Sequence, residues 1–529
     1  MNKIEIPYQD TGYFSKLISD YLDEKETLKP FYNHYSDINS FQSIIEERKS
    51  LPINRDILVK SLRRQYDSVE ATTLTKSNIE DLNSNNCFTV TTGHQLNLFT
   101  GPLYFIYKIV SVINLAKELK ANYPENNFVP VYWMATEDHD FEEINHFNLF
   151  KKRYQLVNSK KGAVGKMKLE GVDTVLSELK DDLGDRKGVE DVLRLFSKFY
   201  VSSATYTEAI KGIVNQLFGS YGLVIIDGDD AELKSLFADE FRGELINKTN
   251  YKFINSTSEK LKALGVKPQV NPREINIFYL KDNLRERIVF EGDKYKVLNT
   301  EYQFSKTEIL EELKNNPERF SPNAPMRCMY QEKILPNLAY IGGGGELAYW
   351  FQLKAMFNEN NISFPILVLR NSVLYIDKGS AKRILKLDLQ AADIFQDSEE
   401  LIKTYLKNGA EIILELKAEE KSIELAFDDM VKKAGEIDAS LQPMIKAELQ
   451  KSLKAVKNIE ARLMKAEKQK EEISVNQIKN LKEKLFPNNS LQERHDNLIS
   501  ILLFNIGFID ELINYLKPLD KKFLILFEE

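Results

Sequence analysis

The sequence predicts an α/β protein in which a parallel sheet with flanking helices is followed by a C-terminal helical coiled coil. Short apolar runs at 87–92, 128–135, 222–227, 338–341 and 364–369 are typical of parallel strands that are buried on both faces. Stretches with helical spacing, such as 103–119 and 189–218, lie between them. From residue 382 onward, glycine and proline become scarce and apolar residues recur every seven positions, which indicates a coiled coil.

Length and composition exclude several classes of protein. The 529 residues exceed what one hydrophobic core holds, and roughly 100–200 residues per domain suggest several substructures. A net charge of −7 disfavours a nucleic-acid partner, because such binding needs a dominant basic surface. The first residues lack the apolar run of a signal peptide, and no uncharged apolar stretch approaches the roughly 20 residues that span a bilayer. We therefore expect a cytoplasmic protein without a nucleic-acid or membrane partner.

The region before the first strand is predicted to be helical. Segments 41–47 and 56–66 carry helical spacing, and no strand pattern is visible between residues 8 and 84. We predict a helical N-terminal region over 1–84 and an α/β core over 85–381. Cys87 lies in the first predicted strand of this core, and we read it as a small core residue without a catalytic role.

The first strand ends in a Gly-His pair ahead of the helix predicted at 103–119. Glycine lets the backbone approach a ligand closely, and a helix N-terminus offers unpaired N–H groups to an anion. This pattern predicts a nucleotide- or substrate-binding turn formed by Thr91, Thr92, Gly93, His94 and Gln95. The alternative is that His94 only caps the helix or bonds a carbonyl.

The second predicted strand, 128–135, ends in a cluster of acids around a histidine. The cluster is Glu137, Asp138, His139 and Asp140. Ligands bind at the carboxyl ends of strands in open α/β sheets, so we predict that the cluster belongs to the site. A solvated loop with an N-cap carboxylate is the alternative. His146 could add a metal ligand, but HExxH and CxxC spacings are lacking, and we predict no metal site.

Two irregular stretches interrupt the core pattern. A charged, glycine-containing stretch at 151–185 and alternating runs at 275–280 and 287–290 predict insertions near 145–205 and 250–320. The turn signal Gly292-Asp293 makes the second insertion a small β-containing module.

The last part of the core offers further binding candidates. Four glycines, 342–345, precede Glu346 and could admit a ligand to the backbone, although they also suit a plain turn. Tyr349 and Trp350 could stack on a ligand, with a place in the core as the alternative. Arg327 and Arg370 could bind phosphate or carboxylate, with surface ion pairs as the alternative.

The C-terminal third is predicted to form an arm and a docking helix. Two interleaved heptad series form its seam: Leu449, Val456 and Leu463, and Ser452, Ile459, Ala466 and Ile473. We predict an arm over 382–489, with a shorter helix from residue 478 turning back on the long one, and a helix at 498–516 within 490–529 that docks on the core. Because one short helix covers only part of the seam, we expect a homodimer through the coiled coil.

The separate motifs resemble one known family when they are read together. Thr91 to His94 is similar to the (His/Thr)-x-Gly-His signature of the nucleotidyltransferase superfamily. The wider set resembles the bacillithiol-biosynthesis cysteine-adding enzyme family, and its members are Thr92–Gln95, Glu137–Asp140, Ser321–Arg327 with Gln331, Gly343–Trp350 and Gln492–Arg494. The chain departs from the family pattern at Cys328 and Gly344, where proline is usual.

The resemblance implies a fold and an activity. It implies a Rossmann-like, nucleotidyltransferase-type core with two connecting-peptide insertions and a C-terminal coiled coil, often dimeric. The implied activity joins L-cysteine to glucosaminyl-malate, with ATP or another nucleotide and Mg²⁺ as cofactors. His94, Asp138 and His139 are then the catalytic candidates. The binding candidates are Thr91, Thr92, Gly93, Gln95, Glu137, Asp140, Asn323, Arg327, Gln331, Gly345, Glu346, Tyr349, Trp350 and Arg370.

Two other functions remain open from the residues alone. One is an adenylyltransferase that leaves a nucleotide-linked product. The other is a non-catalytic assembly protein in which the coiled coil carries the function and the nucleotide fold is a relic. The residues also leave open whether ATP yields AMP or ADP.

Overall fold

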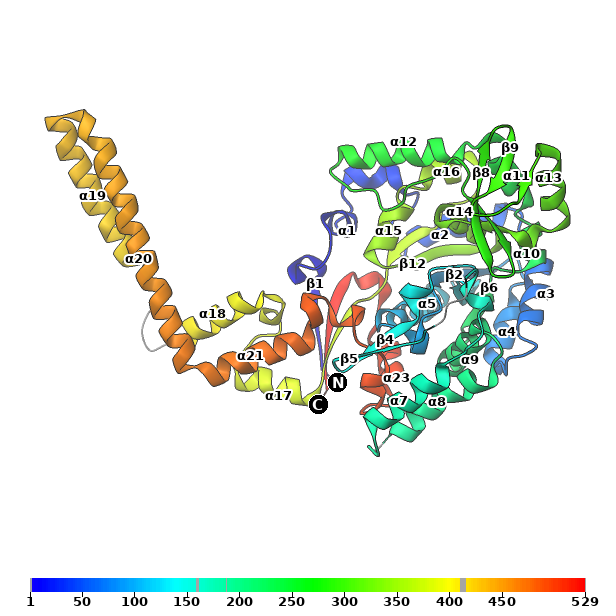
Figure 1. Ribbon diagram of the computed structural model, residues 1–529, viewed down its shortest axis with the longest axis horizontal. Coiled ribbons are helices and arrows are strands. Elements are labelled where there is room, and N and C mark those ends of the chain that lie inside the picture. Colours follow the sequence, from blue (N-terminus) through cyan, green and yellow to red (C-terminus); the bar gives the residue numbers. More distant parts are fainter. Residues whose placement is uncertain (1, 158–160, 187, 410–414, 529) are drawn as a thin grey trace.

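The computed structural model describes residues 2–157, 161–186, 188–409 and 415–528. A globular α/β body carries a long helical arm, and the first and last strands lie side by side (Figure 1). Within the described ranges, the model contains no helix with both the length and the apolar character needed to cross a membrane.

A five-stranded parallel sheet forms the centre of the body. Its strands are β2 (Cys87–His94), β3 (Asn127–Met134), β6 (Val224–Asp227), β12 (Asn337–Gly342) and β13 (Ile366–Leu369). Their spatial order is β13-β12-β2-β3-β6, and every neighbouring pair is parallel. This is the Rossmann order, and the direction of chain progression reverses between β2 and β12. The predicted fold class is confirmed, and ligands are expected at that reversal.

The helix after β2 is more deeply buried than its sequence pattern suggested. α5 (Tyr104–Asn122) buries nearly every side chain between Phe105 and Ala116, whereas a single apolar face was predicted for 103–119. The reason is that α5 packs on β2 and β3 and is also covered by α23 (Phe508–Tyr515). A helix between two layers has no solvent-facing side.

Both ends of the chain join a second, three-stranded sheet. Its order is β1 (Asn2–Pro7), β15 (Lys522–Phe527) and β14 (Val373–Ile376), with β1 antiparallel and β14 parallel to β15. This corrects the expectation that 1–84 is wholly helical. Within 490–529, α23 packs on α5, and the chain then continues into β15. The charged side chains of Lys3 and Glu5 hide the strand pattern of β1, whose partner lies at the far end of the chain. The rest of the N-terminal region contains α1 (Lys16–Leu22), α2 (Ser40–Ser50), α3 (Arg55–Gln65) and α4 (Thr73–Asp81).

Two insertions leave the core where the irregular stretches were predicted. The first contains α6 (Phe141–Ile144), the hairpin β4 (His146–Leu149) and β5 (Lys152–Gln155), α7 (Val172–Leu183) and α8 (Val189–Ser202), after which α9 (Tyr206–Phe218) leads to β6. The second follows α10 (Ala231–Ser235), α11 (Ala238–Asn247) and α12 (Asn250–Ala263).

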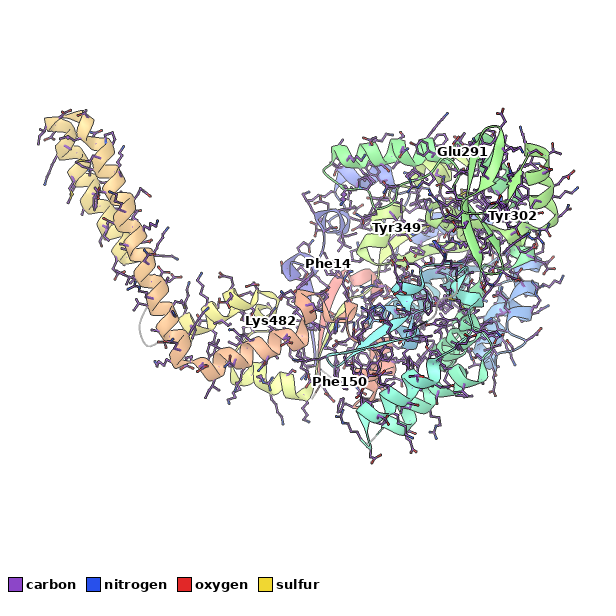
Figure 2. The ribbon with its side chains drawn as sticks, viewed as in Figure 1. Phe14, Phe150, Glu291, Tyr302, Tyr349 and Lys482 are labelled. Atoms are coloured by element: carbon purple, nitrogen blue, oxygen red, sulfur yellow. The ribbon has the colours of Figure 1, made fainter. Side chains whose placement is uncertain are left out.

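The second insertion is built on an antiparallel sheet of order β10-β9-β8-β7-β11. Its elements are β7 (Ile277–Lys281), β8 (Leu284–Glu291), β9 (Lys294–Val297), β10 (Gln303–Phe304), α13 (Lys306–Asn315) and β11 (Phe320–Pro322). Gly292 and Asp293 have φ of 58° and 63° and form the predicted turn. We call this sheet with α13 the β-module. The chain then returns to the core through α14 (Ala324–Ile334), β12, α15 (Gly344–Trp350), on which Figure 2 labels Tyr349, and α16 (Lys354–Glu359).

The arm is an antiparallel helical hairpin of α19 (Lys417–Ile437) and α20 (Gln442–Lys470), which projects from the body (Figure 1). Most of the predicted seam lies on α20, and its partner α19 precedes it in the chain. We had expected the partner to be the shorter helix that follows the seam. That shorter helix, α21 (Glu472–Leu485), leads back to the body and packs on α18 (Ser398–Gly409) and α17 (Lys378–Lys386). The helix predicted at 498–516 is broken into α22 (Ile499–Leu502) and α23, with the poor helix formers Asn505 and Gly507 between them.

Candidate functional site

A cavity of about 790 Å³ opens at the carboxyl ends of β2, β3 and β12. The sheet supplies Gly93 and His94, and the chain beyond β2 and β3 supplies Gln95, Glu137 and Asp138. Asn323 precedes α14, Arg327 lies on α14, and Glu346 and Tyr349 lie on α15. The β-module contributes Phe278 from β7 and Arg285 from β8, and the chain that leads into it contributes Arg273. The cavity therefore lies at the topological reversal between β2 and β12.

His94 forms part of the cavity wall at the end of β2. Its ring stacks on Phe105 with centroids 4.9 Å apart, and its edge meets Tyr104 at 5.4 Å. Burial and the nearby charge of Lys108 lower the pKa of His94 to about 3. The imidazole of His94 is therefore neutral, with one ring nitrogen that can donate a hydrogen bond and one that can accept. Residues 95–103 lie between His94 and α5, which begins one residue after the start of the helix predicted at 103–119.

The lowered pKa of His94 has a measurable consequence for stability. Between pH 6.5 and 3 the unfolded chain binds a proton at His94 that the folded protein does not, so stability falls as the pH is lowered through this window. We expect the free energy of unfolding of the wild type to fall more steeply than that of His94→Gln, by up to about 1.4 kcal/mol per pH unit. Urea unfolding at pH 6, 5 and 4 measures both slopes, and parallel slopes would contradict a neutral His94.

Gly93 leaves room for the side chain of Arg327. A Cβ at this position would lie 3.1 Å from Nη1 of Arg327 and 3.4 Å from the hydroxyl oxygen of Tyr340. Arg327 donates to Oε1 of Gln331 at 3.1 Å, so the predicted Gln331 lies behind the cavity wall and orients the guanidinium. Arg327 forms no ion pair with any carboxylate of the described residues. Its Nη2 also donates to Sγ of Cys328 at 3.4 Å. No carboxylate of the described residues balances its charge, which favours an anionic ligand on this side of the cavity.

Two further arginines line the cavity, and the sequence analysis missed both. Arg285 of β8 lies with its Nη1 2.7 Å from Nδ1 of His139 and packs over the ring of Phe278 at 4.0 Å. Arg273 precedes β7 and is exposed to solvent. Neither arginine forms an ion pair within the described part of the chain. His139 is itself exposed and outside the cavity wall, so its contact with Arg285 suggests positioning where we had predicted catalysis.

The acidic cluster divides into residues with different partners. Asp138 lines the cavity and accepts from Nε2 of Gln95 at 2.7 Å. Glu137 pairs with the buried Lys234 at 2.6 Å. Asp140 accepts from the backbone N–H of Glu143 at 3.3 Å and caps α6, as the N-cap alternative stated. Over the described ranges, no three His, Cys, Asp or Glu side chains gather closely enough to hold a metal ion.

Glu346 is held at the cavity edge by a buried lysine. It accepts from Nζ of Lys108 at 2.8 Å, from the hydroxyl of Tyr340 at 2.7 Å and from the backbone N–H of Gly343 at 2.9 Å. The Lys108 charge and these bonds lower the pKa of Glu346 to about 2. Lys108 also donates to the carbonyl of Gly93 at 2.6 Å. The sequence analysis missed Lys108, whose signal is a lone charge within an apolar helix.

The remaining candidates near the glycine run have different surroundings. Tyr349 lines the cavity, and Asn323 caps α14 at its wall. Trp350 is fully buried and packs on Tyr340 with ring centroids 4.6 Å apart, which matches the core alternative. Gly345 is exposed and does not line the cavity, where we had predicted ligand contact. Gly342 is the glycine of this run with the closest neighbours.

Thr91 and Thr92 are buried inside the sheet and do not line the cavity. The hydroxyl of Thr91 donates to Oδ1 of Asn337 at 2.8 Å, and that of Thr92 donates to the carbonyl of Ile341 at 2.7 Å. Both bonds join β2 to β12. The structure thus assigns them to the support of the cavity floor, where we had predicted ligand contact.

Arg370 binds the C-terminal segment and not a ligand. Its guanidinium pairs with the carboxylate of Glu493 at 2.7 Å, and both side chains are almost fully buried. The predicted ligand contact therefore does not match this geometry. We call residues 490–497, which follow α21, the segment after the arm. The pair fastens this segment to the end of β13.

Comparisons with known proteins agree with the fold. The family description "Bacillithiol biosynthesis BshC, N-terminal Rossmann-like domain" matches residues 1–371, and "Bacillithiol biosynthesis BshC, C-terminal coiled-coil domain" matches residues 373–528. A protein of Flavobacterium johnsoniae named "Putative cysteine ligase BshC" is 46% identical over 98% of this chain and 99% of its own length. Proteins of the same name from Cytophaga hutchinsonii and Bacillus thuringiensis are 39% and 29% identical over 97% of both chains. From its two matched domains and these full-length relatives, we conclude that the chain belongs to the bacillithiol biosynthesis BshC family.

Proposed function

We propose that this protein is a ligase that joins L-cysteine, through its carboxyl group, to the amine of glucosaminyl-malate with nucleotide activation. The relatives' name supports cysteine as one substrate. The observation that carries the proposal is the set of three arginines without ion pairs, Arg273, Arg285 and Arg327, around the neutral His94 in one cavity.

The charges of the cavity suit these substrates. Nucleotide phosphates, the cysteine carboxylate and the malate group are all anionic, and guanidinium groups bind phosphate and carboxylate through two parallel hydrogen bonds. Arg327 and Arg285 are the residues that would hold the nucleotide phosphates. Mg²⁺ would bind between these phosphates and one or two carboxylates of the protein. When bound, the nucleotide would supply both the activation of the cysteine carboxyl group and the phosphate-containing leaving group that departs as the amide bond forms.

The chain's own residues then have two tasks. His94 would donate its ring N–H to the charge that develops on the phosphate or the carboxyl oxygen. The attacking amine must lose one proton, and Asp138 is the acidic-cluster residue on the cavity wall without a lysine or arginine partner within ion-pair distance in the described ranges. We therefore assign to Asp138 the role of the general base that accepts the proton from the attacking amine.

Mass analysis of the product tests the proposal. The pure protein is incubated with ATP, Mg²⁺, cysteine and glucosaminyl-malate, and the expected product is the acceptor plus one cysteinyl residue. A stable product that carries an adenylyl group would indicate an adenylyltransferase. No product, together with no thermal shift at saturating nucleotide, would favour the assembly protein with a relic fold.

Asp138→Asn is expected to lower turnover about 10²-fold or more, because general-base catalysis contributes roughly this factor. Asp182→Asn is the matched control, since Asp182 pairs with Lys152 at the surface of the first insertion. Equal turnover by the two variants in the same assay would remove Asp138 from the mechanism.

We also propose that the protein is a homodimer through the arm. Only part of the seam is covered by α19: Val456 is 8% exposed, whereas Ile459 and Leu463 are 52% and 40% exposed. Leu425 of α19 is also exposed. A second copy of the arm would bury these side chains.

Changing Ile459 and Leu463 together to aspartate is expected to shift the mass in light scattering from a dimer to the 61.2 kDa monomer. Both positions are exposed, so the change leaves the contact between α19 and α20 in place. Val201→Asp, at an exposed apolar position on the body, is the control and should remain dimeric. An unchanged mass of the double variant would move the dimer contact away from this face.

A further inference from the structure

A second cavity of about 360 Å³ adjoins the main one and shares Gln95, Tyr104 and Glu143 with it. Three parts of the chain that are distant in sequence form its wall: the loop after β2, the hairpin β4–β5 of the first insertion, and the segment after the arm. The segment contributes Arg494 and His495. One elongated ligand could therefore occupy both cavities.

The wall of this smaller cavity offers a cation and an unsatisfied acceptor. Arg494 is exposed, and no ion pair or side-chain hydrogen bond of the described residues includes it. Asn97 is 7% exposed, and its buried Oδ1 accepts no hydrogen bond from the described residues. His495 bonds Asp496 through Nδ1 at 2.9 Å, which leaves Nε2 for other partners. These groups match a ligand with an anionic group at one end and a hydroxyl or amine donor at the other.

The segment that holds Arg494 is fixed on both sides. Before it, Glu493 pairs with Arg370 at 2.7 Å. After it, the carbonyl of Asp496 accepts from the N–H of Leu103 at 2.8 Å, and Nδ2 of Asn497 donates to the carbonyls of Phe99 and Gly101 at 2.8 and 2.7 Å. The arginine is thus held against the same loop that carries Asn97. Such preorganisation lowers the entropic cost of binding.

We propose that the smaller cavity binds the carboxylate-bearing part of the acceptor through Arg494, with Nε2 of His495 accepting from a hydroxyl or amine of the same molecule. This inference rests on the proposed function for the identity of the acceptor. The main cavity then holds the nucleotide and cysteine, and the shared wall at Gln95 and Glu143 is where the acceptor amine meets the activated carboxyl group.

The histidines allow a test that does not depend on turnover. The chain has five histidines. His146 and His495 line the smaller cavity, His94 lines the main one, His139 contacts its Arg285, and His34 lies beside Glu47 in the N-terminal region. We expect titration of ¹³C-histidine-labelled protein with L-malate to shift the ring signals of His146 and His495 and to leave that of His34 unchanged.

Arg494→Gln should weaken this response about tenfold or more, as expected for loss of a charge-assisted hydrogen bond. Arg462→Gln is the matched control, because Arg462 is exposed on the distant α20. The same Arg494 variant should raise the KM for glucosaminyl-malate by a similar factor and leave the KM values for ATP and cysteine unchanged.

Three results would overturn the subsite: shifts confined to His94 and His139, no shift at His146 and His495, or an Arg494→Gln titration equal to that of the wild type. Failure of the proposed function looks different. In that case the wild type shows the malate-dependent shifts at His146 and His495 and forms no cysteine-containing product, so the subsite stands without the ligation.

Discussion

Replacing His94 by alanine is expected to reduce formation of the cysteine-containing product about 10²- to 10⁴-fold, to the limit of detection in the mass assay. The imidazole lies at the end of β2 on the wall of the main cavity, and its lowered pKa keeps it neutral. It can therefore donate a hydrogen bond to a developing negative charge at every pH used for the assay. Alanine removes that donor.

The packing of His94 dictates the controls for this experiment. Its ring stacks on Phe105, so alanine also leaves a gap, whereas His94→Gln retains most of the volume and an N–H donor in a different place. Circular dichroism and the melting temperature check that both variants fold. His34→Gln is the matched histidine control, since His34 lies outside both cavities. Wild-type turnover by both His94 variants would remove the histidine from the mechanism.

The second large effect is expected on stability, at the buried pair of Arg370 and Glu493. The side chains are 4% and 1% exposed, and Ser372 also bonds the carboxylate. Arg370→Met leaves the carboxylate charged and without its cation in a dry environment. We expect the free energy of unfolding to fall by about 3–5 kcal/mol, measured by urea denaturation.

An exposed pair provides the comparison. Arg63 and Glu80 are 58% and 50% exposed, and Arg63→Met should change the free energy of unfolding far less, because solvent screens an exposed pair. The double variant Arg370→Met with Glu493→Gln should recover part of the loss, because no uncompensated charge remains buried. A cost at Arg370 as small as that at Arg63 would show that the segment after the arm is not fastened by this pair.

The loss of the Arg370–Glu493 pair is also expected to affect the smaller cavity. Glu493 precedes Arg494 directly, so loss of the Arg370 pair should also disturb the guanidinium that we assign to the acceptor. The stability of the C-terminal segment and the affinity for the acceptor are therefore expected to be coupled, whereas the His94 variants should leave the malate-dependent shifts of His146 and His495 in place.

Local sequence signals were sufficient for the sheet and for one side of the site. Continuous apolar runs predicted the positions of β2, β3, β6, β12 and β13, because strands buried on both faces carry mostly apolar side chains. Parallel strands end at a common edge, so residues at or soon after their carboxyl ends, such as His94 and Asp138, could be expected to lie close together. The heptad repeat likewise indicated the arm.

The other side of the site was decided by tertiary structure. Arg285 belongs to the β-module, Arg273 lies in the chain that leads into it, and Arg494 follows the arm; no local pattern at these three positions indicates a place beside the strand ends. Arg327 and Arg370 looked equivalent, yet only Arg327 is without a carboxylate partner, because the partner of Arg370 is Glu493, far along the chain.

The sequence by itself thus determined which strands form the core and which strand-end residues gather at its edge, since burial and periodicity are local properties of the chain. The pairing of β1 with β15, the choice of α19 as the partner of α20, and the identity of the arginines that have no carboxylate partner among the described residues were decided only by the folded structure. The physical reason is that a charged side chain or a short edge strand acquires its role from its partner, and these partners are brought together by packing between segments that no local pattern connects.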